Sequence, residues 1–96
     1  MGNCQVAATI LFRALSAGKG LLESGERDAG MLRARMREIL RTEMLVNEEY
    51  ISVAHPETLD ELDSVQGAAL LSLAVKIGKT RLIDNFLVEG ITVSAR

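Results

Sequence analysis

Residue types that most often build reactive or metal-binding sites are scarce in this sequence. Among its 96 residues there is one cysteine, Cys4, and one histidine, His55. A single cysteine excludes an internal disulfide, and one cysteine with one histidine falls short of the ligand set of a zinc site. A reducing compartment is the simplest setting for such a chain. We therefore expect a cytoplasmic protein.

Aromatic residues, long apolar runs and an excess of basic charge are also missing. The chain has no tryptophan, one tyrosine and two phenylalanines, so its core must be aliphatic. No apolar run approaches the ~20 residues that span a bilayer. Eleven lysines and arginines stand against thirteen aspartates and glutamates, and this net charge of −2 argues against a nucleic-acid-binding domain.

The first residues match only part of a lipidation signal. Met1-Gly2 is the start that N-myristoylation requires, and Cys4 lies where a palmitoyl group could follow. The signal also requires serine or threonine at the sixth position, where Val6 stands. We expect an arbitrary start of a cut or expressed piece rather than a lipid anchor.

The residues that are present suit one small globular domain. Apolar residues make up 48% of the chain and charged residues 25%, which is ordinary for such a domain. A chain of this length can hold one modest core. We expect residues 1–96 to form a single domain.

The first predicted element is a long helix. Apolar residues recur every four positions over residues 5–23, and Ser24-Gly25 then ends the helical pattern. Gly18 and Gly20 each weaken the helix by ~1 kcal/mol relative to alanine. We expect the helix to persist through them because the apolar face continues on their far side.

A second helix is predicted after Asp28, which serves as its N-cap. Its apolar stripe comprises Leu32, Met36, Ile39 and Leu40. Another face carries four arginines, three of them at four-residue spacing: Arg33, Arg37 and Arg41, with Arg35 beside them. Such a ridge could bind an anion or phosphate, or it could be a solvated face with Arg41 at the negative end of the helix dipole. We favour the solvated face, because Glu38 offers compensating charge.

The second half of the chain alternates as strands do. The alternation predicts strands over residues 48–54, 68–77 and 80–88. Pro56 ends the first strand, and Gly78-Lys79 makes a tight hairpin turn between the last two. Gly90 breaks the last strand, and residues 91–96 form a tail. The sequence therefore predicts an α+β fold, with two main helices packed on a three-stranded antiparallel sheet that ends in a C-terminal hairpin.

An acidic segment connects the first two strands. We expect a one-turn helix from residue 57 or 58 through Leu62. The carboxylates of this segment are Glu57, Asp60, Glu61 and Asp63. Paired carboxylates can act as acid and base or bind a divalent metal. These four are spread along a short loop without a glycine-ordered ligand pattern, so we favour a solvated connector.

The two residues best suited to nucleophilic or general-base chemistry lack visible partners. His55 would need a nucleophile and an orienting group. We favour a structural role for it at the end of a strand. Cys4 has no histidine near it in the sequence and lies close to the chain start, so we do not assign it as a nucleophile.

The triplet Gly78-Lys79-Thr80 resembles the end of a phosphate-binding P-loop. That loop requires another glycine five residues before Gly78, and a helix after the threonine. Leu73 occupies the first position, and a strand is predicted after Thr80. The P-loop interpretation is therefore rejected.

Three polar side chains follow in the last strand. Asp84 shares a strand face with the apolar Leu82 and Phe86. We expect Arg81 and Asp84 to pair with each other, with a neighbouring strand or with a neighbouring domain. Asn85 is expected to bond to backbone at a strand bend.

Three stretches of the chain resemble one enzyme family. Residues 73–85 read L-A-V-K-I-G-K-T-R-L-I-D-N and resemble the end of pantothenate synthetases, the pantoate–β-alanine ligases. Residues 50–59 look like the family's strand followed by a D-P-E-T-L-like turn, although His55 stands where the family usually has an acidic residue. Residues 25–36 are similar to the family's helical region. The resemblance runs from about residue 7 to residue 88.

This resemblance implies a part in an ATP-dependent ligase. The family adenylates the carboxylate of pantoate and releases pyrophosphate, and the amine of β-alanine then displaces AMP. Its Rossmann-like nucleotide domain carries an H-x-G-H motif, and an S-S-R stretch that contacts nucleotide lies just before the C-terminal domain. A chain with a single histidine cannot contain H-x-G-H, and no S-S-R occurs in it.

The resemblance therefore implies the family's smaller C-terminal lid domain, without the N-terminal nucleotide domain. We assign no catalytic, cofactor-binding or metal-binding residue and expect the chain to be inactive alone. ATP, magnesium, pantoate and β-alanine belong to the full-length enzyme, and the missing domain is the expected partner; no nucleic acid or membrane partner is expected. The face of this chain that meets the missing domain is expected to be exposed, moderately apolar and available for self-association. The alternative is a free-standing α+β interaction or regulatory module without catalysis.

Overall fold

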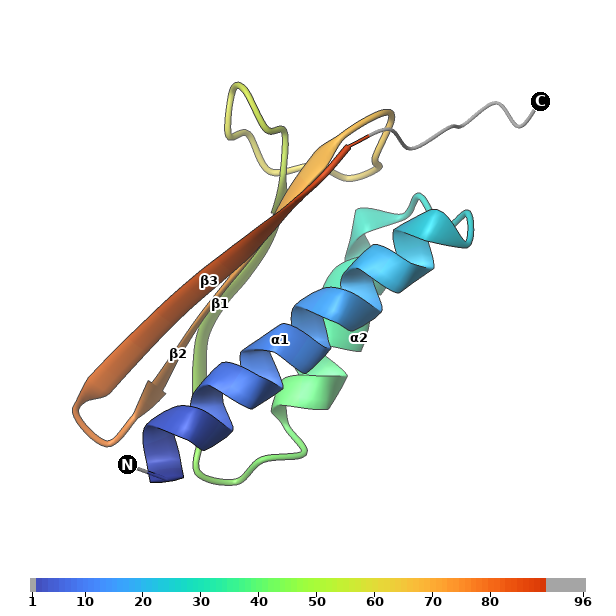
Figure 1. Cartoon of the computed structure of the whole chain (residues 1–96). Coiled ribbons are helices and arrows are strands. Elements are labelled where there is room, and N and C mark those ends of the chain that lie inside the picture. The colour runs from blue at the N-terminus through green and yellow to red at the C-terminus, as the bar shows by residue number, and fades with distance from the viewer. Residues whose placement is uncertain (1, 90–96) are drawn as a thin grey trace.

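The computed structural model describes residues 2–89, with side chains from residue 8 onward. Its elements are α1 (Gly2–Glu23), α2 (Ala29–Leu40), β1 (Asn47–Ala54), β2 (Ala69–Ile77) and β3 (Thr80–Val88). The strands form one antiparallel sheet in the order β1-β2-β3. Both helices lie on the same side of this sheet (Figure 1). The predicted α+β arrangement is confirmed, whereas the tail predicted at 91–96 lies outside the described residues.

Local signals set the ends of the two helices. Gly25 adopts a φ of +110°, and the amides of Gly25 and Glu26 donate back to the carbonyls of Leu22 and Leu21. This is the left-handed ending for which glycine is favoured. The predicted N-cap of α2 is confirmed, because an Asp28 carboxylate oxygen accepts a 2.8 Å bond from the amide of Gly30.

The predicted hairpin joins β2 to β3. Ile77 pairs with Thr80, which leaves Gly78 and Lys79 as a two-residue turn. Gly78 has a φ of +59°, the positive value that such a turn requires. The turn sets the register of the whole β2–β3 ladder, from Ile77–Thr80 to Ala69–Val88.

The core lies between the sheet and the helices. The largest fully buried side chains are Leu15, Leu22, Leu32, Met36, Leu40, Leu71, Leu73, Val53, Val65 and Val75. α1 packs against α2, β2 and β3, whereas α2 packs against α1 and β1. The packing between helices is close at Gly18, where an added Cβ would lie 3.0 Å from the sulfur of Met36. The core is aliphatic, as the sequence predicted.

In the described part of the chain, the opposite face of the sheet carries no helix. Alternation places on it the side chains of Tyr50, Ser52, Leu70, Ser72, Ala74, Ile83, Asn85 and Leu87. A bulge between Glu48 and Tyr50 changes the alternation in β1 and turns Glu48 toward α2, where Arg37 and Arg41 bind it. We call the side of the sheet opposite the helices, which carries the side chains from Tyr50 to Leu87 named above, the helix-free face.

The one-turn helix expected between β1 and β2 is wrong. Residues 56–58 form a turn, and Leu59 then takes a φ of +65°. This left-handed residue reverses the chain, so the amide of Leu62 donates to the carbonyl of Val53 and the segment runs back along β1. Pairing with β1 is favoured over a one-turn helix because it supplies hydrogen-bond partners to backbone groups that a single isolated helical turn would leave without partners.

Candidate functional site

Glu61 is the centre of the densest polar cluster in the described part of the chain. One of its carboxylate oxygens accepts a 2.8 Å bond from the hydroxyl of Ser52. The other accepts from the amide of Val53 at 2.8 Å and from the guanidinium of Arg33 at 3.0 Å. The reversal at Leu59 is what brings this carboxylate to the outer edge of β1.

Arg33 joins the same cluster from α2. Besides Glu61, its guanidinium donates to the backbone carbonyls of Leu62 and Val53. The side chain therefore ties the second helix, the first strand and the connecting loop together. We call Arg33, Ser52, Val53 and Glu61 the Glu61 cluster.

The hydrogen bonds of this cluster shift the pKa of Glu61. Partial burial alone raises that pKa, because it disfavours the charged carboxylate. The bonds from Val53 and Ser52 and the bonds and positive charge of Arg33 act in the opposite direction and outweigh burial. The pKa of Glu61 therefore lies below its ordinary value of 4.5, and the carboxylate is held ionised.

The arginine face of α2 is also occupied by carboxylates. Arg37 binds Glu48 at 3.0 Å and Arg41 approaches the same carboxylate at 3.4 Å. Arg35 pairs with Glu38 on its own helix at 2.6 Å. The interpretation of this face as a solvated one missed these partners, because Glu48 lies on a strand and Glu61 on a loop. An anion-binding ridge would first have to displace these carboxylates.

His55 caps the turn that follows β1. Its Nδ1 accepts hydrogen bonds from the amides of Glu57 at 3.1 Å and Thr58 at 3.2 Å. An acidic side chain, which the family resemblance puts at this position, would offer an oxygen acceptor to the same amides. In this arrangement Nδ1 of the ring is the acceptor for both amides. Within the described residues, both groups that bind the ring are backbone amides and neither is a nucleophile.

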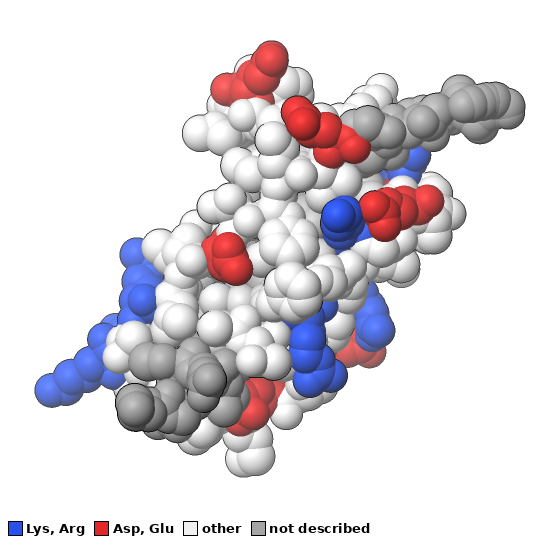
Figure 2. All heavy atoms as spheres, viewed as in Figure 1, with Lys and Arg blue, Asp and Glu red and all other residues white. Residues whose placement is uncertain are grey.

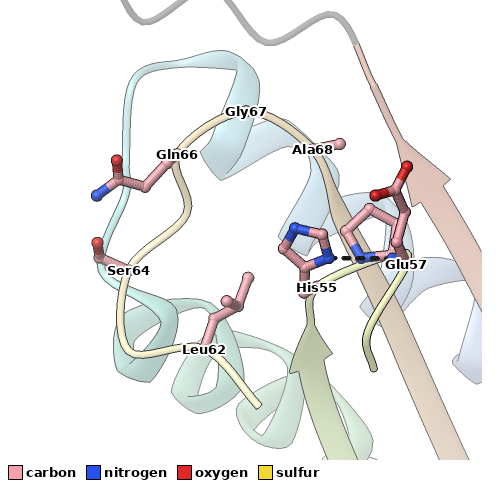
Figure 3. Close-up of a pocket in the computed structure, with 8 residues that line it drawn as sticks. His55, Glu57, Leu62, Ser64, Gln66, Gly67 and Ala68 are labelled. Carbon is pink, nitrogen blue, oxygen red and sulfur yellow. Dashed lines mark hydrogen bonds between the residues drawn. The ribbon is translucent and has the colours of Figure 1, made fainter. Parts of the chain in front are cut away.

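The ring of His55 also borders a shallow hollow of about 370 Å³. Figure 3 shows the ring at the end of β1 and the loop of Leu62, Ser64 and Gln66 curving around it. A second hollow, of about 430 Å³, lies on the helix-free face between Tyr50, Leu59 and Leu70, with Glu61 on its rim. Both hollows are open to solvent, whereas small-molecule sites enclose most of their ligand, so neither has the usual form of an enzyme site.

The remaining polar candidates are dispersed. Lys79 lies in the hairpin turn at the end of the sheet, Thr80 is the first residue of β3, and both are exposed to solvent. The side chain of Arg81 does not pair with Asp84 or with the adjacent strand β2, as two of the expected alternatives had it, but reaches across β2 to Glu49 of β1 at 2.6 Å. Asp84 accepts a 2.8 Å bond from the amide of Asn85. The side chain of Cys4 lies outside the described ones.

Metal and membrane-spanning sites are not found among the described residues. They contain no group of three histidine, cysteine, aspartate or glutamate side chains placed to hold a metal ion. The oxygens of Glu61, the best-placed carboxylate of the acidic loop, already bind Arg33, Ser52 and Val53. None of the described helices combines the length and the apolar character needed to cross a bilayer.

Several known proteins are similar to this chain in sequence. The sequence pattern of the Pantoate-beta-alanine ligase family matches residues 3–87. The pantothenate synthetase of Chloroflexus aggregans is 52% identical over 84 residues, which are 86% of this chain and 30% of that protein. The pantothenate synthetase of Caldicellulosiruptor saccharolyticus is 39% identical, over 92% of this chain and 31% of that protein.

The fold is similar as well. The crystal structure of pantothenate synthetase from Thermus thermophilus superimposes with a TM-score of 0.80 at 29% identity, over 90% of this chain and 31% of that one. This chain therefore spans about three tenths of the length of the relatives it matches. Because the family pattern covers nearly the whole chain, the protein belongs to the pantoate–β-alanine ligase family.

Proposed function

We propose that this chain is the C-terminal lid domain of a cytoplasmic ligase that joins pantoate to β-alanine at the expense of ATP, and that it is inactive alone. The observation that carries the proposal is the unequal coverage of the match. The relatives align with almost all of this chain, but with only about 30% of their own length. The remainder of the relatives is where we place the adenylation chemistry.

The side chains of this chain support the same division of labour. Its one histidine caps a turn, and Glu61 of the acidic loop binds arginine and backbone. A general base or a metal ligand needs a free lone pair aimed at substrate. The described residues offer no fitting set for magnesium, so we assign no step of the reaction to a metal held by this chain.

A lid contributes by closing over the site. Closure excludes water, which would otherwise hydrolyse a reactive acyl adenylate, and it holds the amine near the acyl carbon. We propose the helix-free face as the surface that closes. It is the uncovered side of the sheet, and it combines apolar Tyr50, Leu70 and Ile83 with polar Ser72 and Asn85.

The test is a chimera with the synthetase of Chloroflexus aggregans. Its C-terminal third is replaced by this chain, and release of AMP is measured with ATP, pantoate and β-alanine. The truncated relative and this chain alone are expected to be inactive, whereas the chimera is expected to be active. An inactive but folded chimera would contradict the lid role and favour a free-standing interaction module. Turnover by this chain alone would contradict its inactivity.

Paired variants of the chimera test the closing face. Ser72→Arg places a long charged side chain in the middle of the helix-free face and is expected to lower kcat at least tenfold. Lys19→Ala changes an exposed position on α1 and is expected to leave kcat unchanged. Equal activity of the two folded variants would exclude the helix-free face from closure.

A further inference from the structure

One edge of the sheet is open. Among the described residues, 2–89, β3 is the last strand of the sheet, and its nine residues are paired on one side only, with β2. The opposite edge is partly covered, because Glu61 and Leu62 bond to the backbone of Val53 in β1. An unpaired edge strand presents backbone donors and acceptors that another strand can bind.

Apolar side chains lie on both sides of this edge. On the helix-free face, Ile83 is 53% exposed and Leu87 is 52% exposed. On the helix side, Phe12 of α1 is 58% exposed while its ring packs edge-on against Phe86, with centroids 5.8 Å apart. Figure 2 shows the side on which α1 and β3 lie, and its middle is largely uncharged with an acidic group within it.

We propose that β3 pairs with β3 of a second copy of this chain, antiparallel and centred on Asn85. In this register Ile83 lies opposite Leu87 of the second copy. Arg81, which binds Glu49 of its own copy, lies opposite Glu89 of the second. Each contact occurs twice by symmetry, so the pairing gives two apolar and two oppositely charged cross-strand pairs. Centring the pair one residue earlier would place two Asp84 carboxylates opposite each other, which is unfavourable.

Phe12 extends the contact below the strands. The two-fold axis is perpendicular to the sheet, so α1 of both copies lies on the same side of the joined sheet. The Phe12–Phe86 pair of each copy then borders the seam, and its exposed ring area is covered. The interface is small, and Asp84 must release the amide of Asn85 for the strands to pair. The dimer is therefore weak and reversible.

Cysteine cross-linking tests the register. In a Cys4→Ser background, Asn85→Cys places two thiols opposite each other at the axis, with Cβ atoms about 5 Å apart. Ile83→Cys places its two thiols about 13 Å apart, four residues out of register, which is beyond disulfide reach. We expect Asn85→Cys to form disulfide dimers at least tenfold faster than Ile83→Cys or Leu87→Cys alone. A mixture of the Ile83→Cys and Leu87→Cys chains should form disulfide dimers quickly, because positions 83 and 87 lie opposite each other in the proposed register.

Sedimentation velocity over a concentration series tests the dimer itself. The wild-type chain is expected to show a reversible monomer–dimer equilibrium. Glu89→Arg should raise the dissociation constant about three- to tenfold, and Arg81→Glu with Glu89→Arg should restore it. Circular dichroism verifies that each variant is folded. A wild-type chain that stays monomeric at all concentrations, or equal cross-linking at positions 83, 85 and 87, would overturn the proposal.

Discussion

At the scale of single residues, Glu61 connects parts of the chain that are far apart in sequence. It binds Ser52 and Val53 of β1 and Arg33 of α2, the last 28 positions away. Charge-assisted bonds of this kind are stronger than neutral ones, and a backbone amide at a strand edge needs an acceptor. Through Glu61, the acidic loop holds α2 and β1 together, and we call this contact the clasp. The interpretation of the loop as a solvated connector did not foresee it.

Glu61→Gln is expected to lower the free energy of unfolding by about 1 kcal/mol. Glutamine keeps the shape and one acceptor but loses the charge that Arg33 binds, and the site is half exposed. Urea denaturation measures the change. Glu57→Gln is the matched control, because that side chain is exposed and lies outside the Glu61 cluster, so it should have no effect. Equal stability of the two variants would contradict the clasp.

The same carboxylate predicts a pH dependence. The folded pKa of Glu61 lies below its unfolded value, so the unfolded state binds more protons in acid. Its stabilising contribution is complete above the ordinary value of 4.5 and is lost as pH falls through the lower folded pKa. The stability difference between wild type and Glu61→Gln should therefore shrink below pH 4.5, as urea titrations at pH 7, 5, 4 and 3 would show. A difference that grew in acid would contradict this sign.

His55 provides a second residue-scale test. His55→Asp supplies an oxygen acceptor to the amides of Glu57 and Thr58 and is expected to keep wild-type stability. His55→Ala removes the acceptor and should cost about 1 kcal/mol, the usual loss for a missing cap. Thermal denaturation at pH 7.5 compares the variants. Equal melting temperatures for the alanine and aspartate variants would show that the cap does not contribute.

At the scale of elements, the two glycines of α1 have different roles. Gly18 lies where α1 crosses α2 and β2, and an added Cβ would stand 3.0 Å from Met36 and 3.2 Å from Leu71. At Gly20 an added Cβ would meet nothing within 4 Å. From the sequence, Gly18 and Gly20 were expected to weaken the helix equally. Only at Gly18 does close packing against Met36 and Leu71 offset this loss of helix stability.

This contrast is testable with two substitutions. Gly20→Ala should raise the free energy of unfolding by about 0.5–1 kcal/mol, because it restores helix propensity without a clash. Gly18→Leu should lower it by about 1–3 kcal/mol, because a large side chain must displace Met36 and Leu71. Denaturant titration measures both. A stabilising effect of Gly18→Leu would refute the close packing of the elements.

At the scale of the whole molecule, one aliphatic layer holds the helices on the sheet. Leu71 of the central strand is fully buried in that layer, whereas Leu45 in the loop before β1 is 51% exposed. A chain of this size has little stability to spare. The arrangement leaves the other side of the sheet free, and this is the surface that we propose closes over the rest of the ligase.

Truncation of these two leucines separates core from surface. Leu71→Ala should cost about 2–5 kcal/mol, which is a large share of the total stability of a small domain. Leu45→Ala should cost less than about 1 kcal/mol. The midpoint of urea denaturation, monitored by circular dichroism, measures both. Similar losses for the two variants would mean that the layer is not the dominant core.

The sequence by itself determined the two helices, the three strands, most of their ends and the family. Periodicity of 3.6 or 2, the Asp28 cap and the Gly78 turn are local signals, and each needs only neighbouring residues to act. Tertiary structure alone decided the partners of Arg33, Arg37 and Glu61. Those contacts depend on the path of the connecting loop, which one left-handed residue, Leu59, turns back along β1. A leucine in that conformation has no local signature, because the pairing of the reversed segment, rather than the residue's own preference, stabilises it.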